Sequence, residues 1–470
     1  MKKSILLGAA ALAAMALAAP KAADAGETKI GGNYTFRMVN TDNTPDDKAG
    51  EKTASFMAQR LQLNMDFKAN DKSHAHLVTR VLNNNFVQGA DFQEVSTVAG
   101  DNWNIRQLWL ETEAWGVGIK AGNMPLAMND GILVDNDTTS YGSFLLSKNF
   151  GPATLVGGLV KVAEQNTSIT TTATTALPTA GATASADIDL WALSVLGKAS
   201  NIDYQVTGLY LNQEKNMQSM LGGASAYNWT RNGLGPAVNN TNNSVTDGWL
   251  ALTLGTQVAG IDLTGTAIYE TGMTNVTPQS QLAKSGALGA LRIKGKTGFG
   301  GWNGYGFYSS KNFTSAYPGG NQAHWSATWD AGGPGAQDLM EVALTGAPGE
   351  AVPTAASNNM TTDTSNIWGV GIGAAINAGA WTIKPSLDYA RVVDDNLKIP
   401  GVTDTAAGIA ANVGRATYNR ALGGTLGFST KIQESTTLDL SGTWVKPTAR
   451  VTGTNASNMH YLQASVKLDF

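Results

Sequence analysis

The chain has 470 residues, 14% of them charged, and no cysteine. At roughly 100 to 200 residues per domain, this length allows two or three soluble domains. No apolar run reaches the roughly 18 residues that a membrane-spanning helix needs, which excludes a helical membrane protein. Without cysteine there can be no disulfide framework, thiolate zinc site, covalently attached haem or iron–sulfur cluster, so we expect no cofactor.

The amino terminus carries the parts of an export signal. Lys2 and Lys3 form a basic segment, residues 5–19 are apolar, and Ala23 and Ala25 supply the small residues of a cleavage site. We therefore expect a signal peptide over residues 1–25 and a mature chain over 26–470. Cleavage removes three lysines and one aspartate, which leaves 35 acidic and 29 basic residues and a net charge of −6. That balance argues against a nucleic-acid partner, which would need a basic face.

Period-two alternation dominates the mature chain. In residues 60–68, RLQLNMDFK, leucine, methionine and phenylalanine point one way and polar or charged residues the other. The last twelve residues repeat this pattern. It predicts strands near 27–39, 54–69, 72–82, 104–114, 117–123, 140–150, 152–164, 187–199, 200–213, 246–259, 260–272, 285–297, 301–311, 366–377, 380–393, 418–431, 435–448 and 459–470.

Turn length separates a soluble sandwich from a membrane barrel. Very short turns, for example at residues 70–71, 115–116 and 377–379, alternate with polar connections of ten to about fifty residues. Short turns on one side and long loops on the other are typical of a transmembrane β-barrel. We expect an all-β, antiparallel barrel of about 18 strands, with long extracellular loops and short periplasmic turns. Sixteen strands is the alternative, because 117–123 is short and 312–365 could hide or mimic a hairpin.

Several aromatic residues fall near the ends of the predicted strands, where an interfacial girdle would place them. They are Trp103, Trp115, Trp191, Trp249, Trp302, Trp368, Trp381 and Tyr141. Aromatic residues are also common in strands for other reasons. The girdle is therefore an expectation for the fold to test.

The export signal, the alternating strands and the terminal aromatic residue together resemble the Gram-negative outer-membrane porins. In that family a terminal phenylalanine after alternating apolar residues is read by the barrel-assembly machinery. Phe470 with Leu468 and Val466 looks like this signal. The segment Arg106 to Leu126, RQLWLETEAWGVGIKAGNMPL, is similar to the family's hairpin before the third extracellular loop. The resemblance implies an outer-membrane location, contact with outer-membrane lipid, and a homotrimer.

The third loop, roughly residues 123–140, departs from the general porins. In those proteins a Pro-Glu-Phe-Gly-Gly-like turn folds the loop into the pore. Here Asn129 to Asp137, NDGILVDND, stands at that place. The sequence therefore leaves open whether the loop folds inward.

The chemistry of a pore is set by the charges that line it. Arg37, Arg60 and Arg80 lie on the polar faces of three successive predicted strands. Arg106 lies on the next strand, but Leu108 and Leu110 share its parity, so a bulge is required for it to join the row. In the third loop, Asp130, Asp135 and Asp137 could form an opposing acidic wall. Chance alignment of arginines in a polar lumen is the alternative.

The predicted loops hold 19 acidic and 8 basic residues. Their net charge of −11 would gather cations at the mouth, within a Debye length of about 8 Å. It could equally be the solubility charge of a surface. We expect a weak cation preference that the third loop controls.

Two further patterns carry little chemistry. His74 and His76 share one strand face and could bind a metal, but no third ligand is visible, so we expect no metal site. Gly369, Gly371 and Gly373 repeat with a period of two, which does not fit a nucleotide-binding loop and favours small residues on a lumen face.

These observations predict a porin, a passive water-filled channel for ions and small hydrophilic solutes, and not an enzyme. One alternative is a substrate-specific outer-membrane channel, which the length of the chain favours. Another is the sheath of an electron conduit around a multihaem cytochrome, which would depend entirely on a haem-carrying partner. A barrel enzyme would need a catalytic constellation, and only four histidines are present.

Overall fold

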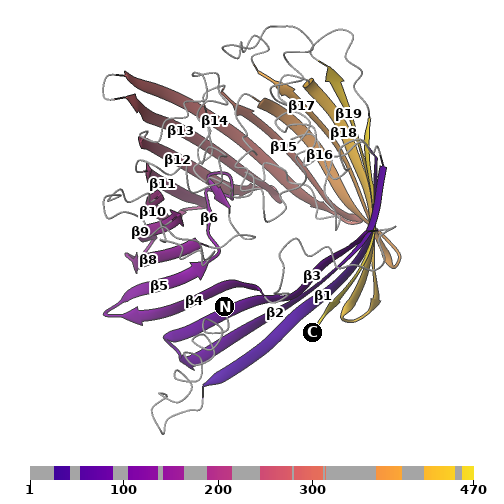
Figure 1. Ribbon diagram of the computed structural model, residues 1–470, viewed down its shortest axis with the longest axis horizontal. Helices are drawn as coiled ribbons and strands as arrows, with labels where there is room; N and C mark the ends of the chain where they lie inside the picture. Colours follow the sequence, from indigo (N-terminus) through magenta and orange to yellow (C-terminus); the bar gives the residue numbers. More distant parts are fainter. Residues whose placement is uncertain are drawn as a thin grey trace, which may run out of the picture.

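The computed structural model describes residues 26–42, 53–87, 104–135, 141–163, 188–213, 244–277, 280–310, 313, 367–393, 418–449 and 458–470. The expected signal peptide lies outside these residues. In the part of the chain that is described, no helix is long and apolar enough to cross a membrane. The described residues form strands joined by turns (Figure 1).

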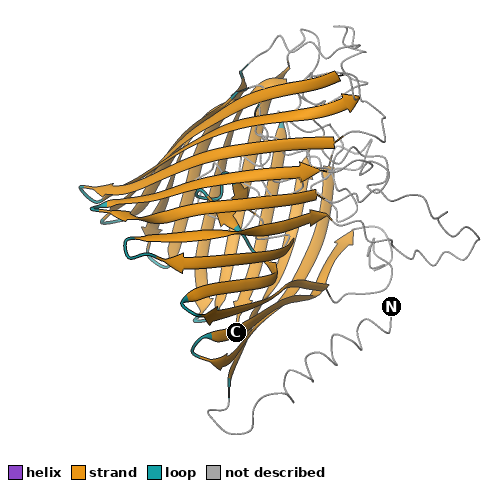
Figure 2. Ribbon diagram, turned by 90° about the vertical axis from the view of Figure 1, so that its left-hand side faces the viewer, coloured by secondary structure: helices purple, strands orange, loops and turns teal. Residues whose placement is uncertain are grey.

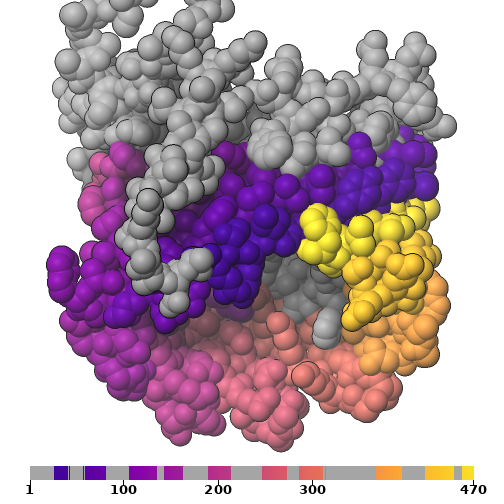
Figure 3. Space-filling view, turned by 90° about the horizontal axis from the view of Figure 1, so that it is seen from below, coloured from indigo at the N-terminus to yellow at the C-terminus, as the bar shows by residue number. Residues whose placement is uncertain are grey.

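Eighteen strands form one closed antiparallel sheet. Each pairs with the barrel strands next to it in the chain, and β1 also pairs with β20. The strands are β1 (Glu27–Asp42), β2 (Thr53–Asn70), β3 (Ser73–Val87), β4 (Asn104–Ala114), β5 (Val117–Met124), β8 (Tyr141–Asn149), β9 (Ala153–Ala163), β10 (Ile188–Ala199), β11 (Ile202–Gln213), β12 (Ser244–Val258), β13 (Ile261–Thr277), β14 (Ser280–Thr297), β15 (Gly300–Ser309), β16 (Ile367–Ala378), β17 (Trp381–Val392), β18 (Tyr418–Gln433), β19 (Thr436–Ala449) and β20 (Met459–Asp469). In Figure 3 the first strand lies beside the last. The expected barrel is confirmed, with eighteen strands and not sixteen.

Alternation divides each strand between the two faces of the wall. On β20, Leu462 is 56% exposed on the outside, whereas Tyr461, Gln463 and Ser465 are buried on the inside. Because side chains of a strand alternate between faces, the sequence pattern produces an apolar outer belt and an inner wall that carries both polar and apolar side chains.

The short turns gather at one end of the barrel (Figure 2). Two of them place both residues in the left-handed region: Trp115 and Gly116, with φ of 54° and 70°, and Ala259 and Gly260, with φ of 51° and 80°. Positive φ at both positions matches the right-handed twist of the flanking strands, so these tight hairpins are favourable. At the opposite end one expected loop, 273–284, is largely absent. β13 and β14 continue through it to the pair Thr277 and Ser280, since its threonine and valine residues favour strand.

The barrel closes through the last residue. The backbone N–H of Phe470 donates to the carbonyl oxygen of Gly32 at 3.1 Å, and the N–H of Gly32 donates back at 2.9 Å. A Cβ atom at Gly32 would lie 2.9 Å from Cζ of the Phe470 ring. The ring therefore lies over a glycine of β1 on the outer face. Leu468 and Val466 pair with Tyr34 and Phe36 of the same strand.

The aromatic residues follow the expected girdle only in part. Trp191 is 52% exposed on the outer face of β10. Trp249 is 2% exposed and belongs to the buried apolar cluster inside the barrel, so its assignment to the girdle was wrong. It shares the inward parity of Ala251 and Thr253 on β12, which places it in the lumen. Trp103 lies outside the described residues.

Candidate pore constriction

The third loop folds into the barrel as a small hairpin. Its strands, β6 (Ala127–Met128) and β7 (Val134–Asp135), pair antiparallel with each other and stand apart from the barrel sheet. Figures 1 and 2 place this hairpin inside the ring of strands. The inward course that the sequence left open is therefore present, although the family's turn is missing.

Three successive residues at the hairpin tip have left-handed backbone conformations. The φ angles of Asn129, Asp130 and Gly131 are 54°, 59° and 74°. Asn, Asp and Gly are the residue types that tolerate this conformation best. The N–H of Ile132 donates to the carbonyl oxygen of Asn129 at 3.1 Å and closes the turn. The Asn-Asp-Gly triplet thus forms the turn at the place where the general porins have a Pro-Glu-Phe-Gly-Gly-like turn.

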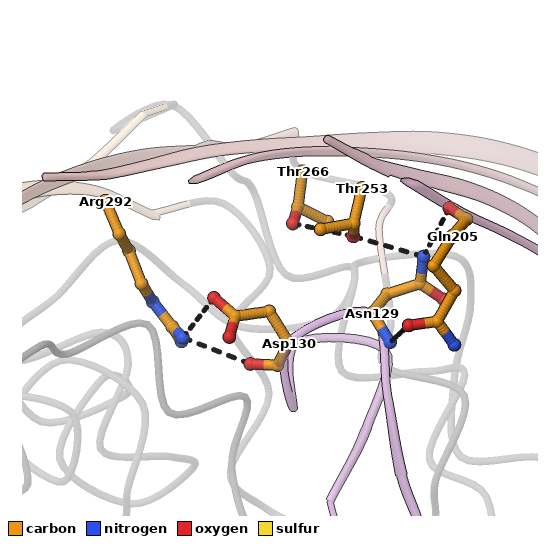
Figure 4. A network of polar contacts seen from close by, with 6 residues as sticks. All are labelled: Asn129, Asp130, Gln205, Thr253, Thr266 and Arg292. Carbon is orange, nitrogen blue, oxygen red and sulfur yellow. Dashed lines mark hydrogen bonds and ion pairs between the residues drawn. The ribbon is translucent and has the colours of Figure 1, made fainter. Parts of the chain in front are cut away.

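Asn129 attaches the tip to the inner wall (Figure 4). Its backbone N–H donates to Gln205 Oε1 of β11 at 3.1 Å, and its side-chain Nδ2 donates to Thr253 Oγ1 of β12, also at 3.1 Å. Thr253 in turn is hydrogen bonded to Thr266 of β13 at 2.9 Å. Asn129 is fully buried. Asn129 therefore ties the loop to two neighbouring strands, and Thr253 extends the network to a third.

Asp130 forms the second attachment. Its carboxylate accepts a 2.5 Å contact from a terminal nitrogen of Arg292 on β14, and its backbone carbonyl accepts from the same nitrogen at 3.1 Å. The Arg292 side chain is only 10% exposed. Charge-assisted hydrogen bonds are stronger than neutral ones, and two contacts from one guanidinium also fix direction. The charge of Asp130 is thereby balanced on the wall where the loop is docked.

Apolar residues of the loop complete the docking. Leu126, Met128, Ile132, Leu133 and Val134 are each no more than 7% exposed. They belong to the same buried cluster as inward residues of β11, β12 and β13. Fully burying an aliphatic side chain contributes roughly 1.5–3 kcal/mol. The loop is thus held by packing as well as by its polar tip.

The predicted arginines form a diagonal row on the far side of the barrel. Arg37 lies opposite Ala58, two residues from Arg60 on β2. Arg80 lies opposite Gln62, two residues from Arg60 in the other direction. Such diagonal neighbours are about 7–8 Å apart. Counting around the eighteen strands, the row on β1 to β3 lies nine strands from the wall of β12 to β14 that receives the loop tip. The arginines and the loop therefore face each other across the lumen.

The bulge that Arg106 requires in order to join this row is present. Between β3 and β4, Val78 pairs with Gln107 and Thr79 pairs with Ile105, so Arg106 is the extra residue that lies opposite none. A bulge changes the face to which the following residues point. Arg106 therefore need not point to the same face as Leu108 and Leu110, which are exposed on the outer face.

The other two aspartates are placed only in part. Asp135 pairs with Ala127 in the hairpin, its side chain lies outside the described residues, and Asp137 lies outside them altogether. The sequence analysis missed the receiving residues Gln205, Thr253 and Arg292. The alternation along their strands indicates that these three side chains point inward. No feature of the neighbouring sequence shows that they contact a loop about 76 to 162 residues away.

Comparisons with known proteins bear on the fold. No protein-family model matches the chain, and no curated protein matches it. Among solved structures, a BenF-like porin from Pseudomonas fluorescens Pf-5 superposes with a TM-score of 0.53 at 10% identity, over 94% of this chain and 99% of that one. Pseudomonas aeruginosa OpdO gives 0.53 at 9% identity over 94% and 98%, and OpdQ gives 0.51 at 10% over 94% and 98%. At such low identity the likeness establishes the fold, which is that of outer-membrane porins.

Proposed function

We propose that this protein is an outer-membrane channel through which ions and small hydrophilic solutes diffuse passively. The observation that carries the proposal is the third loop, which is docked on one inner wall and faces an arginine row on the other. A fixed loop narrows the lumen, and the side chains that remain in the opening select by size and charge. The likeness to a BenF-like porin and to OpdO supports a channel and not an enzyme.

A substrate-selective channel is the second candidate, and one feature of the lumen favours it. The loop fills part of the interior together with buried apolar residues such as Leu211, Trp249 and Ile268. An interior that is packed on one side leaves less open area than eighteen strands alone would enclose. A narrower lumen lets individual side chains contact a passing solute.

Charge selectivity follows from the same arrangement. Asp130 is balanced by Arg292, so the acidic wall that would oppose the arginine row depends on Asp135 and Asp137. If these two face the lumen, they oppose the arginine row across the opening, and a weak cation preference follows. If they do not, Arg37, Arg60, Arg80 and Arg106 govern the opening.

The remaining expectations extend this proposal. A cleaved signal at residues 1–25 would export the chain, and Phe470, Leu468 and Val466 would present it to the barrel-assembly machinery. The exposed apolar belt suits contact with outer-membrane lipid. A homotrimer would be the functional unit, as the family resemblance implies.

Single-channel recording of the purified protein in planar bilayers tests the proposal. We expect stepwise, ohmic conductance in potassium chloride. Saturable block by one class of solute would select the substrate-specific channel over the general one. Absence of any conductance from protein that shows heat-modifiable mobility, and is therefore folded, would refute both.

A further inference from the structure

The imidazole side chains of two histidines lie on the inner wall of the barrel, away from the constriction. His74 and His76 lie on β3, close to the short turn that joins it to β2. Residues i and i+2 of a strand share one face, and the cross-strand partners of His76 are Asp66 and Trp109. The two imidazole rings are parallel within 10°, and their centroids are 6.4 Å apart.

The environment of His76 fixes its hydrogen-bonding roles. Nδ1 lies 2.5 Å from Asp66 Oδ1. A carboxylate oxygen accepts, so Nδ1 donates to Asp66, and in the neutral ring Nε2 is then the nitrogen with the free lone pair. The Trp109 ring stacks on the imidazole at a centroid distance of 4.5 Å. Metal-binding histidines almost always donate their second nitrogen to a carboxylate or carbonyl in this way, which orients the ring and makes it a better ligand.

The charged groups around the pair leave a local excess of negative charge. Four lysines face it from the neighbouring strands and turns, and each is paired with a carboxylate: Lys29 with Glu27, Lys68 with Asp71, Lys72 with Glu113, and Lys120 with Glu111, at 3.3, 2.6, 2.9 and 3.1 Å. Among the described ion pairs, Asp66 has His76 as its partner and no lysine. The hydrogen bond and charge of Lys68 lower the pKa of Asp71, which lies in the turn. A cation bound between the histidines would therefore meet one carboxylate, Asp66, that has no lysine partner among the described ion pairs.

We propose that His74 and His76 bind a divalent transition-metal ion, with Nε2 of His76 and one nitrogen of His74 as ligands and water completing the shell. Neutral imidazole is the commonest protein ligand for such ions. For a nitrogen-donor site, Cu²⁺ binds most tightly among the first-row divalent ions. No group of three or more ligand side chains is assembled for a metal in the described part of the chain, so this is an open site from which the ion can exchange.

One shared ion requires a change in the His74 ring. A metal lies about 2 Å from a ligating imidazole nitrogen, in the plane of the ring. The two rings are stacked, with centroids 6.4 Å apart, so their in-plane lone pairs do not meet at one point in this arrangement. His76 is held by Asp66 and Trp109, and the His74 side chain must therefore rotate to share the ion.

Titration of the purified full-length barrel with copper sulfate tests the proposal. Calorimetry should show one Cu²⁺ per chain that is lost in the His74→Gln/His76→Gln variant, and electron paramagnetic resonance should show coupling to two nitrogen nuclei. Asp66→Asn should weaken binding by about tenfold or more, because outer partners of a ligand typically contribute 10–100-fold. His460→Gln is the matched control. His460 is exposed on β20, at the other end of the barrel, so its substitution should leave the binding of one Cu²⁺ per chain unchanged.

Unchanged copper stoichiometry and affinity in the double histidine variant, with heat-modifiable mobility confirming that it is folded, would overturn the site. Unchanged affinity in Asp66→Asn would overturn the orienting role of Asp66. The binding measurement does not require the channel to conduct, so its failure is separate from failure of the proposed function. As a second readout, Cu²⁺ added from the short-turn side should reduce single-channel current in the parent and less in the double variant. Equal reduction in both would also count against the site.

Discussion

The hydroxyl of Tyr305 on β15 donates a 2.9 Å hydrogen bond to Asp388 Oδ1 on β17, across the whole width of β16. Gly371 of β16 lies in register with both residues. A Cβ atom at position 371 would overlap the Tyr305 ring and the Asp388 carboxylate. The absence of a side chain at Gly371 therefore lets Tyr305 reach across β16 on the lumen wall to Asp388. Tyr305 and Asp388 are both buried.

Gly371→Ala should consequently destabilise the barrel. Forcing a methyl group into a packed interior typically costs 1–3 kcal/mol, so we expect a loss of about that size in the free energy of unfolding, measured by urea titration in detergent or lipid. Gly265→Ala on β13 is the control, because no atom lies within 4 Å of its Cβ position. Equal stability of the two variants would contradict the close packing.

Phe470 should be needed for assembly. Its deletion, or Phe470→Ser, removes the ring over Gly32, and deletion also removes two backbone hydrogen bonds of the closing seam. We expect a sharp fall in heat-modifiable barrel in outer-membrane fractions. Asp469→Ser changes the neighbouring residue on the lumen face and should assemble normally. A normal yield of the Phe470 variants would mean that the terminal strand is not read as proposed.

The two faces of one strand should respond oppositely to charge. Leu63→Arg puts a charge on the outer face of β2, which should cost about 2–4 kcal/mol near the bilayer midplane. Asn64→Arg puts the same side chain on the lumen face and should leave folding nearly unchanged. A reversible folding assay compares the two. Equal losses would show that the assignment of faces is wrong.

This alternation explains why the barrel could be predicted and its constriction could not. Strand face and turn length depend on only a few neighbouring residues, so the eighteen strands and the short turns could be predicted. The alternation on β12 also places Trp249 on the inner face. Its assignment to the girdle was wrong only because its position near a strand end was given more weight than the alternation. The loop contacts are different, because Asn129 and Thr253 are 124 residues apart, and Asp130 and Arg292 are 162. Any inward polar residue could have received the tip.

The arginine row should set the charge preference of the opening. Arg60 is exposed on the lumen face of β2, with Arg37 and Arg80 as its diagonal neighbours. Arg60→Ala removes one positive charge at short range, where salt screens little. The reversal potential in a potassium chloride gradient should therefore shift toward cations. Lys446→Ala, on the outer face of β19, should not shift it. Identical potentials for both variants would remove the row from the conducting path.

The Asp130–Arg292 pair should hold the third loop against its wall. Arg292→Gln removes the charge from a side chain that is only 10% exposed and leaves the tip with Asn129 as its polar attachment. We expect larger open-channel current and more current noise, because a loosened tip both uncovers area and moves. Asp130→Asn should act in the same direction. The double variant should add little to either single change, since residues in one ion pair are coupled.

Lys294→Gln separates this effect from a simple change of lumen charge. Lys294 is the next inward residue on β14, is exposed, and has no ion-pair partner among the described residues. Lys294→Gln therefore removes the same charge without affecting a contact of the loop. It should shift the reversal potential toward cations and leave the current noise at the parental level. Arg292→Gln should differ from it in noise and conductance. If the two variants are indistinguishable in all three measurements, the ion pair does not hold the loop, and the apolar residues around Ile132 and Leu133 suffice to keep it in the lumen.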